Sequence, residues 1–322
     1  MAFDLLVIGD VSIDQYMKVS KNTEIYGDVN LGTAQLMLPY GSKIPVDDFG
    51  SNIAGNSCNV AMAVAKTGLK VGVYTEMGDD TAGRKFREEF RESGINVKYC
   101  LLSKEEPTNV HTIIVKDGER TILSYHRDRE YNVQDWETPK WLYYTSMPPK
   151  FQTFQSELIE YIKQNPKIGV AFNPGTYHLK AGLESIRNFL EVTDILFVNK
   201  EEAIKLVGNN DIEDLHKNLQ NLGPKMTVIT EGKTGSSVSV HKEKAVELGV
   251  FKDLRPIVDK TGAGDAHSGG FLAAILHGKS LEEALKWGTL NSSSVIRQVG
   301  SVNGQLTLAD IEETLKHNPK FE

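Results

Sequence analysis

The sequence contains only two cysteines, Cys58 and Cys100, among 322 residues. That number excludes the disulfide framework that stabilises many small secreted domains. Basic residues are not in excess either, because 36 Lys and Arg stand against 43 Asp and Glu, which gives a formal net charge of −7. A chain of this charge has no general electrostatic attraction for nucleic acid or for an anionic membrane. We therefore expect neither as a partner.

Long hydrophobic runs are also missing, since no apolar stretch approaches the roughly 18 residues that a membrane span needs. The first residues, Met1 to Asp4, lack the basic region of a signal peptide, so a cytoplasmic protein is expected. Hydrophobic residues make up 40% and charged residues 25%, which are ordinary globular values and argue against disorder. At roughly 100–200 residues per domain, the length fits one large domain or two modest ones.

Short β-rich runs alternate with helical stretches along most of the chain. The patterns predict strands at residues 5–9, 71–74, 141–144, 168–172, 195–198 and 226–230, and helices at 54–67, 80–93, 151–163, 179–190, 201–207 and 269–277. Strands that alternate with helices in this way predict an α/β fold, in which a mostly parallel sheet carries helices on both faces.

Two regions interrupt this alternation. Residues 11–50 are rich in Gly, Pro and polar residues, and residues 97–125 contain two β-rich runs, 110–116 and 120–125. Asp117-Gly118 joins these runs, and Asp-Gly between such runs is typical of a β-hairpin. The two regions form either a small separate sheet outside the α/β body or two unrelated surface excursions.

The segment from Asp259 to Asp265 (D-K-T-G-A-G-D) carries the clearest chemical signal, because it precedes an apolar helical run. Small residues before a helix let backbone N–H groups approach a ligand, and the helix N-terminus favours an anion. An aspartate in such a turn repels a phosphate, so its presence needs a reason. Asp265 either removes a proton from an attacking hydroxyl or caps the helix.

Other chemical motifs fail on spacing. Gly232-Lys233-Thr234 resembles the end of a Walker A loop, but Thr227 stands where that loop needs glycine. Gly262-x-Gly264 begins a dinucleotide fingerprint, but His267 occupies the position of its third glycine. Neither HExxH nor a Cys/His zinc spacing occurs.

The segment 259–265 closely resembles the D-T-x-G-A-G-D signature of the ribokinase-like (PfkB) carbohydrate kinases. Five further segments match that family in the right order: Gly9 to Asp14, Ala54 to Ala61, Glu76 to Gly83, Asn199 to Glu202 (N-x-x-E), and Thr230 to Gly235 (T-x-G-x-x-G). Each motif is weak alone, but their order along residues 3–315 is highly specific.

The resemblance implies a single kinase domain over residues 1–322, with a three-layer α/β sandwich and a small β-sheet lid. The lid segments are expected at about 11–50 and 97–130. The implied reaction transfers the γ-phosphoryl group of ATP to a hydroxyl group, with Mg²⁺ as cofactor and K⁺ as the expected monovalent cation. A homodimer through the lid is common in the family, so a monomer and a lid-mediated homodimer both stay open for this chain.

The resemblance also assigns residues. Asp265 becomes the general base, and Gly262, Ala263 and Gly264 form the anion hole. The acceptor is expected at Ser12, Asp14, Gly55, Asn56 and Asn59, and the nucleotide at Asn199, Glu202, Thr230, Gly232, Gly235 and Asn291. Mg²⁺ is expected through water near Asn199 and Glu202, and a monovalent cation at Asp259, Thr261, Val295 and Gly300. Lys260 replaces a family Thr and is interpreted as exposed or as a backbone contact, with contact to a phosphate as the alternative.

Three functions remain open at this stage: a kinase of an uncharged sugar, a nucleoside kinase, or a degenerate member that binds sugar without turnover. A nucleoside needs a base pocket, for which Tyr26, Tyr40 and Phe49 are candidates. Glu105 and Glu106 would repel a phosphorylated acceptor. The basic residues near the lid form either a solvated surface or an acceptor contact; they are His111, His126, Arg127 and Arg129.

Overall fold

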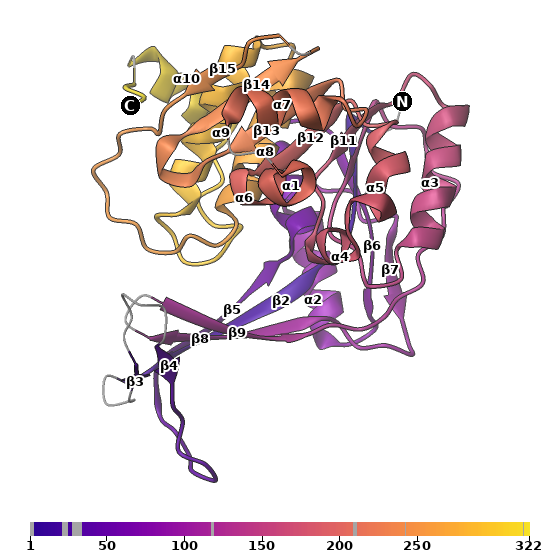
Figure 1. Ribbon diagram of the computed structural model, residues 1–322. Coiled ribbons are helices and arrows are strands. Elements are labelled where there is room, and N and C mark those ends of the chain that lie inside the picture. The colour runs from indigo at the N-terminus through magenta and orange to yellow at the C-terminus, as the bar shows by residue number, and fades with distance from the viewer. Residues whose placement is uncertain are drawn as a thin grey trace.

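A long central sheet organises the computed structural model, which describes residues 3–20, 25–27, 34–116, 119–208, 211–241, 243–317 and 319–322 (Figure 1). Within these residues the sheet has nine strands. Their order is β15 (Val246–Leu248), β14 (Ser236–Val240), β13 (Met226–Thr230), β12 (Ile195–Asn199), β11 (Gly169–Phe172), β10 (Trp141–Tyr144), β1 (Leu5–Ile8), β6 (Val71–Gly78) and β7 (Cys100–Ser103). All neighbours pair in parallel except β14 with β13 and β15 with β14. The carboxyl ends of the parallel strands therefore meet along one edge.

Helices cover both faces of this sheet, as the alternation of elements predicts. On β1, Leu5 and Val7 pack into one core and Leu6 and Ile8 into the other, so all four side chains are buried. The first layer consists of α1 (Asn56–Ala65), α2 (Thr81–Glu92), α8 (Ala263–Leu276), α9 (Leu281–Val295) and α10 (Leu308–Lys316). The second consists of α3 (Gln152–Gln164), α4 (Thr176–Ala181), α5 (Leu183–Leu190), α6 (Lys200–Val207) and α7 (Ile212–Gln220). In the described residues, no helix is both long and apolar enough to cross a bilayer.

The predicted strands 141–144 and 226–230 have the predicted bounds. The predicted helix at 179–190 is instead two helices, α4 and α5, because Gly182 between them has a φ of +86°, which ends a right-handed helix. The helix expected from residue 269 begins earlier, at Ala263 inside the glycine-rich motif. The motif therefore forms the first turn of a helix.

The two irregular regions meet in a four-stranded sheet, here called the small sheet, with the order β5 (Val46–Ala54), β2 (Ser12–Val19), β8 (Val110–Lys116) and β9 (Glu119–Tyr125). Strands β8 and β9 pair antiparallel, as the hairpin pattern predicts, although the Asp117-Gly118 turn itself lies outside the described residues. Residues 100–103 join the main sheet as β7 instead of the small sheet. The short strands β3 (Ile25–Tyr26) and β4 (Gln35–Leu36) pair farther out. The small sheet projects from the body (Figure 1).

The chain segments that connect the small sheet to the body converge at Asn109, whose side chain is fully buried. Its Nδ2 donates to the Val11 carbonyl at 3.2 Å, and its Oδ1 accepts from the Arg127 amide at 3.0 Å. Gly55 packs against the backbone of Val11 at the same junction, because a Cβ atom on Gly55 would lie 2.9 Å from the Cα of Val11. The φ of Gly55 is +107°, which side chains rarely adopt. One compact junction therefore fixes the base of the small sheet.

Candidate active site

Asp265 lies in the first turn of α8, and its carboxylate faces α1. The Nδ2 of Asn59 on α1 donates a hydrogen bond of 2.7 Å to Asp265 Oδ2. The two helices approach closely because α8 carries Gly269, where a Cβ atom would lie only 2.5 Å from the Cβ of Ala63 on α1. Gly262 occupies the N-cap position of α8, so Asp265 is not the capping residue. Its carboxylate remains available for chemistry.

Burial raises the pKa of Asp265 to about 6. The hydrogen bond from Asn59 stabilises the charged form and lowers that pKa, whereas the nearby carboxylate of Glu202 raises it. A carboxyl group with a pKa near the working pH is well suited to accept a proton during a reaction.

The N-terminus of α8 presents its backbone amides to open space. In the described residues, no side chain caps this helix, and Gly262 adopts a left-handed φ of +75° that turns the chain into it. A Cβ atom on Gly262 would lie 2.6 Å from the Cβ of Ser301, so the turn packs tightly on that loop. Gly264 is exposed, with open space where a side chain would stand. Free amides at a positive helix end form a site for an anion.

A polar cavity of about 210 Å³ lies in front of this turn. It gathers predicted residues from four parts of the sequence: Asn56, Asn199, Glu202, Thr230, Gly262, Ala263, Gly264 and Asp265. It also contains Asn173, Lys260 and Ser268, which sequence reasoning did not assign to the site. Lys260 is exposed, as expected, yet it borders the cavity and is suited to hold a phosphate group by charge.

Of these three additional residues, Asn173 is the one that the sequence could have indicated. It follows β11 directly, and its Nδ2 donates to the Phe197 carbonyl at 2.8 Å, which fixes the side chain at the carboxyl edge of the sheet. A polar residue followed by proline (Asn173-Pro174) at the end of a predicted parallel strand is a usable signal, because ligands of open α/β sheets bind at this edge.

Asn199 and Glu202 form a reciprocal capping box at the start of α6, with each side chain bound to the other's backbone amide at 2.9 Å. The capping interpretation therefore holds, and both residues also line the polar cavity. Burial raises the pKa of Glu202, and its charge in turn raises the pKa of Asp265. Two carboxylates and three side-chain amides around one polar cavity are the donor chemistry that suits hydrated Mg²⁺.

A second, mostly apolar cleft of about 440 Å³ adjoins the polar cavity and shares Thr230, Lys260, Ala263 and Gly264 with it. Gly232 and Gly235 line this cleft as predicted, beside the hydrophobic side chains of Val250, Phe251, Ile257 and Ile296. Gly235 has a φ of +113°, and a Cβ atom there would lie 2.1 Å from the Leu248 carbonyl oxygen. The glycine therefore allows the loop to pack against this segment.

Asn291 does not join the residues that line either cavity in the described part of the chain. It is buried, donates to the Ala266 carbonyl and to Gln305 Oε1, and accepts from the Leu306 amide. Three hydrogen bonds give it a structural position between α8 and the segment after α9. On the neighbouring turns, Thr289, Ser292 and Ser293 line the apolar cleft instead.

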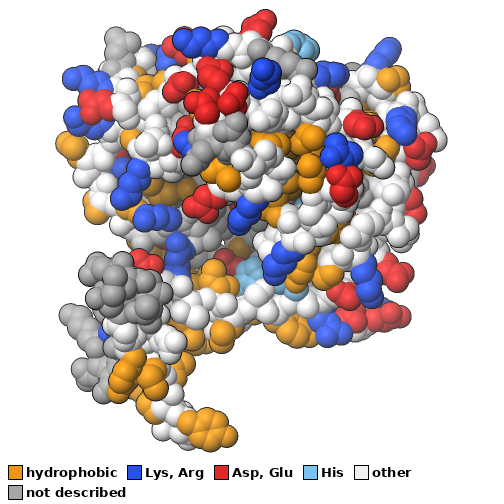
Figure 2. All heavy atoms as spheres, viewed as in Figure 1, with side chains coloured by type: hydrophobic (Ala, Val, Ile, Leu, Met, Phe, Trp, Pro, Cys, Tyr) orange, Lys and Arg blue, Asp and Glu red, His pale blue; other side chains and the backbone are white. Residues whose placement is uncertain are grey.

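Asp14 lies at the base of the small sheet, beside two histidines. Its Oδ1 lies 3.0 Å from His111 Nδ1, and His111 Nε2 lies 2.8 Å from His126 Nε2. Ser12 Oγ is within 3.5 Å of both Asp14 and His111. Figure 2 shows histidine side chains where the small sheet meets the body. His111 therefore orients the predicted acceptor-binding carboxylate.

Asn59 has one polar atom left over. Its Oδ1 is buried and has no hydrogen-bond partner among the described residues. Because a buried acceptor without a partner is costly, this atom is suited to receive a hydrogen bond from a bound hydroxyl group. Asn59 is thus placed to contact the base and the acceptor at once.

The arginines at the junction already have partners. Arg127 forms an ion pair with Glu106, with Nη2 to Oε1 at 3.0 Å, and its pKa is raised by that pair. Arg129 is buried, donates to the Pro107 carbonyl and lies 3.7 Å from Glu76. The Nε and Nη1 atoms of Arg129 have no hydrogen-bond partner among the described residues, and the charge of Arg129 is balanced by the ion pair with Glu76 and that of Arg127 by the ion pair with Glu106.

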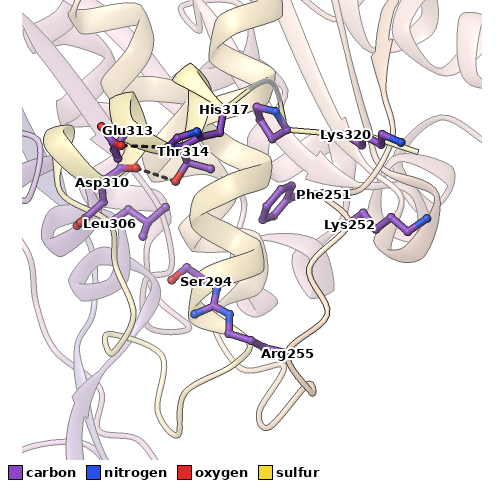
Figure 3. Close-up of a pocket in the computed structure, with 11 residues that line it drawn as sticks. Phe251, Lys252, Arg255, Ser294, Leu306, Asp310, Glu313, Thr314, His317 and Lys320 are labelled. Atoms are coloured by element: carbon purple, nitrogen blue, oxygen red, sulfur yellow. Dashed lines mark hydrogen bonds and ion pairs between the residues drawn. The ribbon is translucent and has the colours of Figure 1, made fainter.

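A larger cavity of about 620 Å³ lies near the C-terminus, between residues 251–255, α9 and α10 (Figure 3). It shares Phe251 with the apolar cleft. Several of its charged groups pair within the chain, including His317 with Glu313 at 3.1 Å and Arg255 with Asp253 at 2.6 Å. Among the described residues, none of the predicted site residues lines it. The chemistry therefore belongs to the other two cavities.

Comparisons with known proteins show which family and which fold this chain shares. The family model of the pfkB carbohydrate kinases matches residues 3–308. The ATP-dependent 6-phosphofructokinase of Thermoanaerobacterium thermosaccharolyticum is 23% identical, covering 96% of this chain and 92% of that protein. The nucleoside kinase of Methanothermobacter thermautotrophicus is 26% identical, covering 81% and 83%. The structure of Arabidopsis thaliana ribokinase complexed with ribose and ATP superposes with a TM-score of 0.80 at 20% identity, covering 98% and 99%.

Proposed function

The chain belongs to the pfkB family of carbohydrate kinases, which are ATP-dependent, and we propose that it phosphorylates a hydroxyl group of an uncharged sugar. The observation that carries this proposal is the position of Asp265, which is part-buried beside Asn59 at the uncapped N-terminus of α8 and lines the polar cavity. The small sheet acts as the lid of a single kinase domain.

In the proposed reaction, Asp265 accepts the proton of the acceptor hydroxyl. The acceptor oxygen forms a bond to the γ-phosphorus of ATP while the bond from that phosphorus to the β,γ-bridging oxygen breaks, and ADP leaves. The amides at Gly262, Ala263 and Gly264 stabilise the charge on the transferred phosphoryl oxygens. Asp265 needs no covalent bond to phosphorus in this scheme.

The acceptor lies between Asp14 and Asp265. Asp14 accepts hydrogen bonds from sugar hydroxyls, and His111 and Ser12 hold it in place. Asn59 Oδ1 accepts a further hydroxyl, and Gly55 and Asn56 bring backbone within reach at the start of α1. This arrangement places one hydroxyl next to the base.

The nucleotide occupies the two adjoining cavities, with its adenine in the apolar cleft and its phosphates at the α8 turn and Lys260. Glu202 and Asn199 hold Mg²⁺ through water. A bound Mg²⁺ would supply positive charge that offsets the charge of the phosphates and of the two carboxylates.

An uncharged acceptor fits the charges at the junction better than a phosphorylated one. A phosphosugar needs a free Arg or Lys for its dianion, yet Arg127 is neutralised by Glu106 and Arg129 lies beside Glu76. The aromatic residues suggested for a nucleoside base do not gather at the acceptor. Phe49 pairs with Met17 on the face of the small sheet opposite Asp14, and Tyr40 is fully exposed.

The test is an ADP-release screen over free sugars, phosphorylated sugars and nucleosides, with Asp265→Asn as the background control. We expect a free sugar to have the highest kcat/KM. A phosphorylated sugar or a nucleoside that exceeds every free sugar by about tenfold, or 1.4 kcal/mol of transition-state preference, contradicts the proposed acceptor class.

Association of two copies through the outer face of the small sheet is part of the proposal. That face exposes Phe49 (57%), Leu123 (57%) and Tyr125 (46%). Patches of this kind favour protein contact. Sedimentation should give a dimer for the wild type, and L123D should shift it toward the monomer.

A further inference from the structure

Arg120 reaches from the small sheet to the body and forms an ion pair with Asp259, the first residue of the glycine-rich motif. It lies four residues before Ser124, whose register partner His111 stands opposite Asp14, so Arg120 and Asp14 share the face that looks toward the body. Both members of the pair are largely buried, with 24% and 15% of their side chains exposed. The contact therefore joins two parts of the proposed active site.

The Asp259 carboxylate is surrounded by N–H donors. Its Oδ1 accepts from the Thr261 amide at 2.8 Å and from Arg120, and its Oδ2 accepts from the Gly300 amide at 3.1 Å. Burial alone would raise the pKa of Asp259, but these two amides and the guanidinium hold it below its usual value. The carboxylate is charged and fully paired in this arrangement.

The same place was expected to hold a monovalent cation, and the donor set fits that ion poorly. A cation needs free oxygens, whereas both Asp259 oxygens already receive N–H groups. Two nearby carbonyls also accept N–H groups, since the Ile296 oxygen accepts from the Val258 and Asp259 amides, and the Val295 oxygen accepts from the Gln298 amide. Arg120 already supplies the positive charge that the carboxylate needs.

We infer that the Arg120 guanidinium takes the place of a monovalent cation in this protein, and that turnover therefore needs no K⁺. The inference rests on the proposed kinase function. Arg120 acts as a positioning residue, because Asp259 also binds Thr261 and Gly300, and Gly262 packs on the adjacent Ser301. One ion pair thereby fixes the turn whose amides form the anion hole.

The ion pair between Arg120 and Asp259 has a further property that a bound ion lacks. The charge is carried on β9 of the small sheet, so it reaches Asp259 only when that sheet lies against the body. Positioning of the α8 turn is thus linked to closure over the acceptor.

The experiment compares kcat of the wild type in K⁺, Na⁺ and tetramethylammonium chloride at equal ionic strength, with the acceptor found in the ADP-release screen. Equal kcat in the three salts is expected. Arg120→Met should lower kcat by about tenfold or more in tetramethylammonium, and K⁺ or free guanidinium should restore part of it. Arg127→Met, a lid arginine paired with Glu106, serves as the matched control and should show no cation response.

A second readout needs no turnover. The melting temperature of Arg120→Met should rise with K⁺ relative to tetramethylammonium, whereas that of the wild type and of Arg127→Met should not. A wild type that requires K⁺ overturns the inference. So does an Arg120→Met variant whose loss no cation repairs and whose KM for ATP rises, because Arg120 then binds phosphate. Absence of turnover with every acceptor contradicts the proposed function instead, and the melting comparison still decides the role of Arg120.

Discussion

Asn59 and Asp265 lie 206 residues apart in the sequence, yet the Asn59 amide nitrogen donates a 2.7 Å hydrogen bond to the Asp265 carboxylate. One partner belongs to α1 and the other to α8, and Gly269 lets the two helices approach. This bond fixes the direction of the carboxylate before any ligand arrives. It also ties the acceptor side of the site to the phosphate side.

Asp265→Asn should lower kcat by at least about 10²-fold, which is the lower end of what a general base contributes. The amide keeps the shape of the side chain but cannot accept the proton, so acceptor affinity should change much less. Steady-state kinetics and calorimetric titration of the acceptor separate the two effects. A variant that retains near wild-type kcat removes Asp265 from the role of base.

The pH dependence should respond in opposite directions to two neighbours of Asp265. The base must be ionised, so kcat/KM falls as pH drops below its pKa, about 6 in the protein without ligands. Asn59→Leu removes a donor that stabilises the anion, so the acid limb should move to higher pH. Glu202→Gln removes a repelling charge and keeps the capping acceptor, so the limb should move to lower pH. Shifts of the same sign in both variants contradict this electrostatic account.

Turnover should require Mg²⁺, because Asp265 and Glu202 face one cavity that must also accept a polyphosphate. Excess EDTA should abolish ADP release, and added Mg²⁺ should restore it. Undiminished activity in EDTA excludes the metal from the reaction.

Lys260→Met should raise the KM for ATP by about tenfold, the loss expected when one phosphate contact is removed. Lys260 borders both cavities, whereas Lys150 lies on the surface beside Asp128 and provides the matched control. The KM for the acceptor should change little. An unchanged KM for ATP would show that Lys260 is a solvent-exposed side chain that does not contact the phosphates.

Asp10 should make the protein less stable as pH rises. Burial raises its pKa from 3.8 to about 7, while Tyr131 donates a 2.6 Å hydrogen bond to it. Between these two pH values the folded chain binds a proton that the unfolded chain has released. Its contribution to the free energy of unfolding is therefore complete below about pH 4 and is lost as pH rises through about 7.

Urea unfolding of the wild type and Asp10→Asn across this window checks the prediction. The decline in the free energy of unfolding should be steeper in the wild type, because the variant cannot titrate at this position. Asp47→Asn changes an exposed carboxyl group of the small sheet and should leave the slope as it is. Equal slopes for the wild type and Asp10→Asn contradict the assignment.

The α/β layers could be predicted because each element carries its own signal. The runs at 141–144 and 226–230 contain no charged residue, and their bounds in the sequence and in the structure coincide. The break at Gly182 was missed, since a glycine inside an apolar helical pattern is often tolerated and only its φ of +86° reveals the interruption. Local pattern therefore predicts the type of element better than its ends.

The site was predictable only in part. The glycine-rich motif indicates an anion turn by composition, and the structure gathers Asn199, Glu202 and Thr230 around it. Asn291 could not be placed, because its three hydrogen bonds depend on where Gln305 and Leu306 lie after α9. The pair between Arg120 and Asp259 joins residues 139 apart, one on β9 of the small sheet and one in the loop before α8, and no spacing rule anticipates such a contact.

The small sheet joins the body at the junction around Asn109, and this junction lies next to the residues proposed to bind the acceptor. Val11, Gly55 and Arg127 all meet there, and Asp14 lies only three residues beyond Val11. A rotation of a few degrees at this point displaces Asp14 slightly, but it moves Arg120, at the other end of β9, much farther. A change in the orientation of the small sheet at this junction would therefore alter the ion pair between Arg120 and Asp259 more than the position of Asp14.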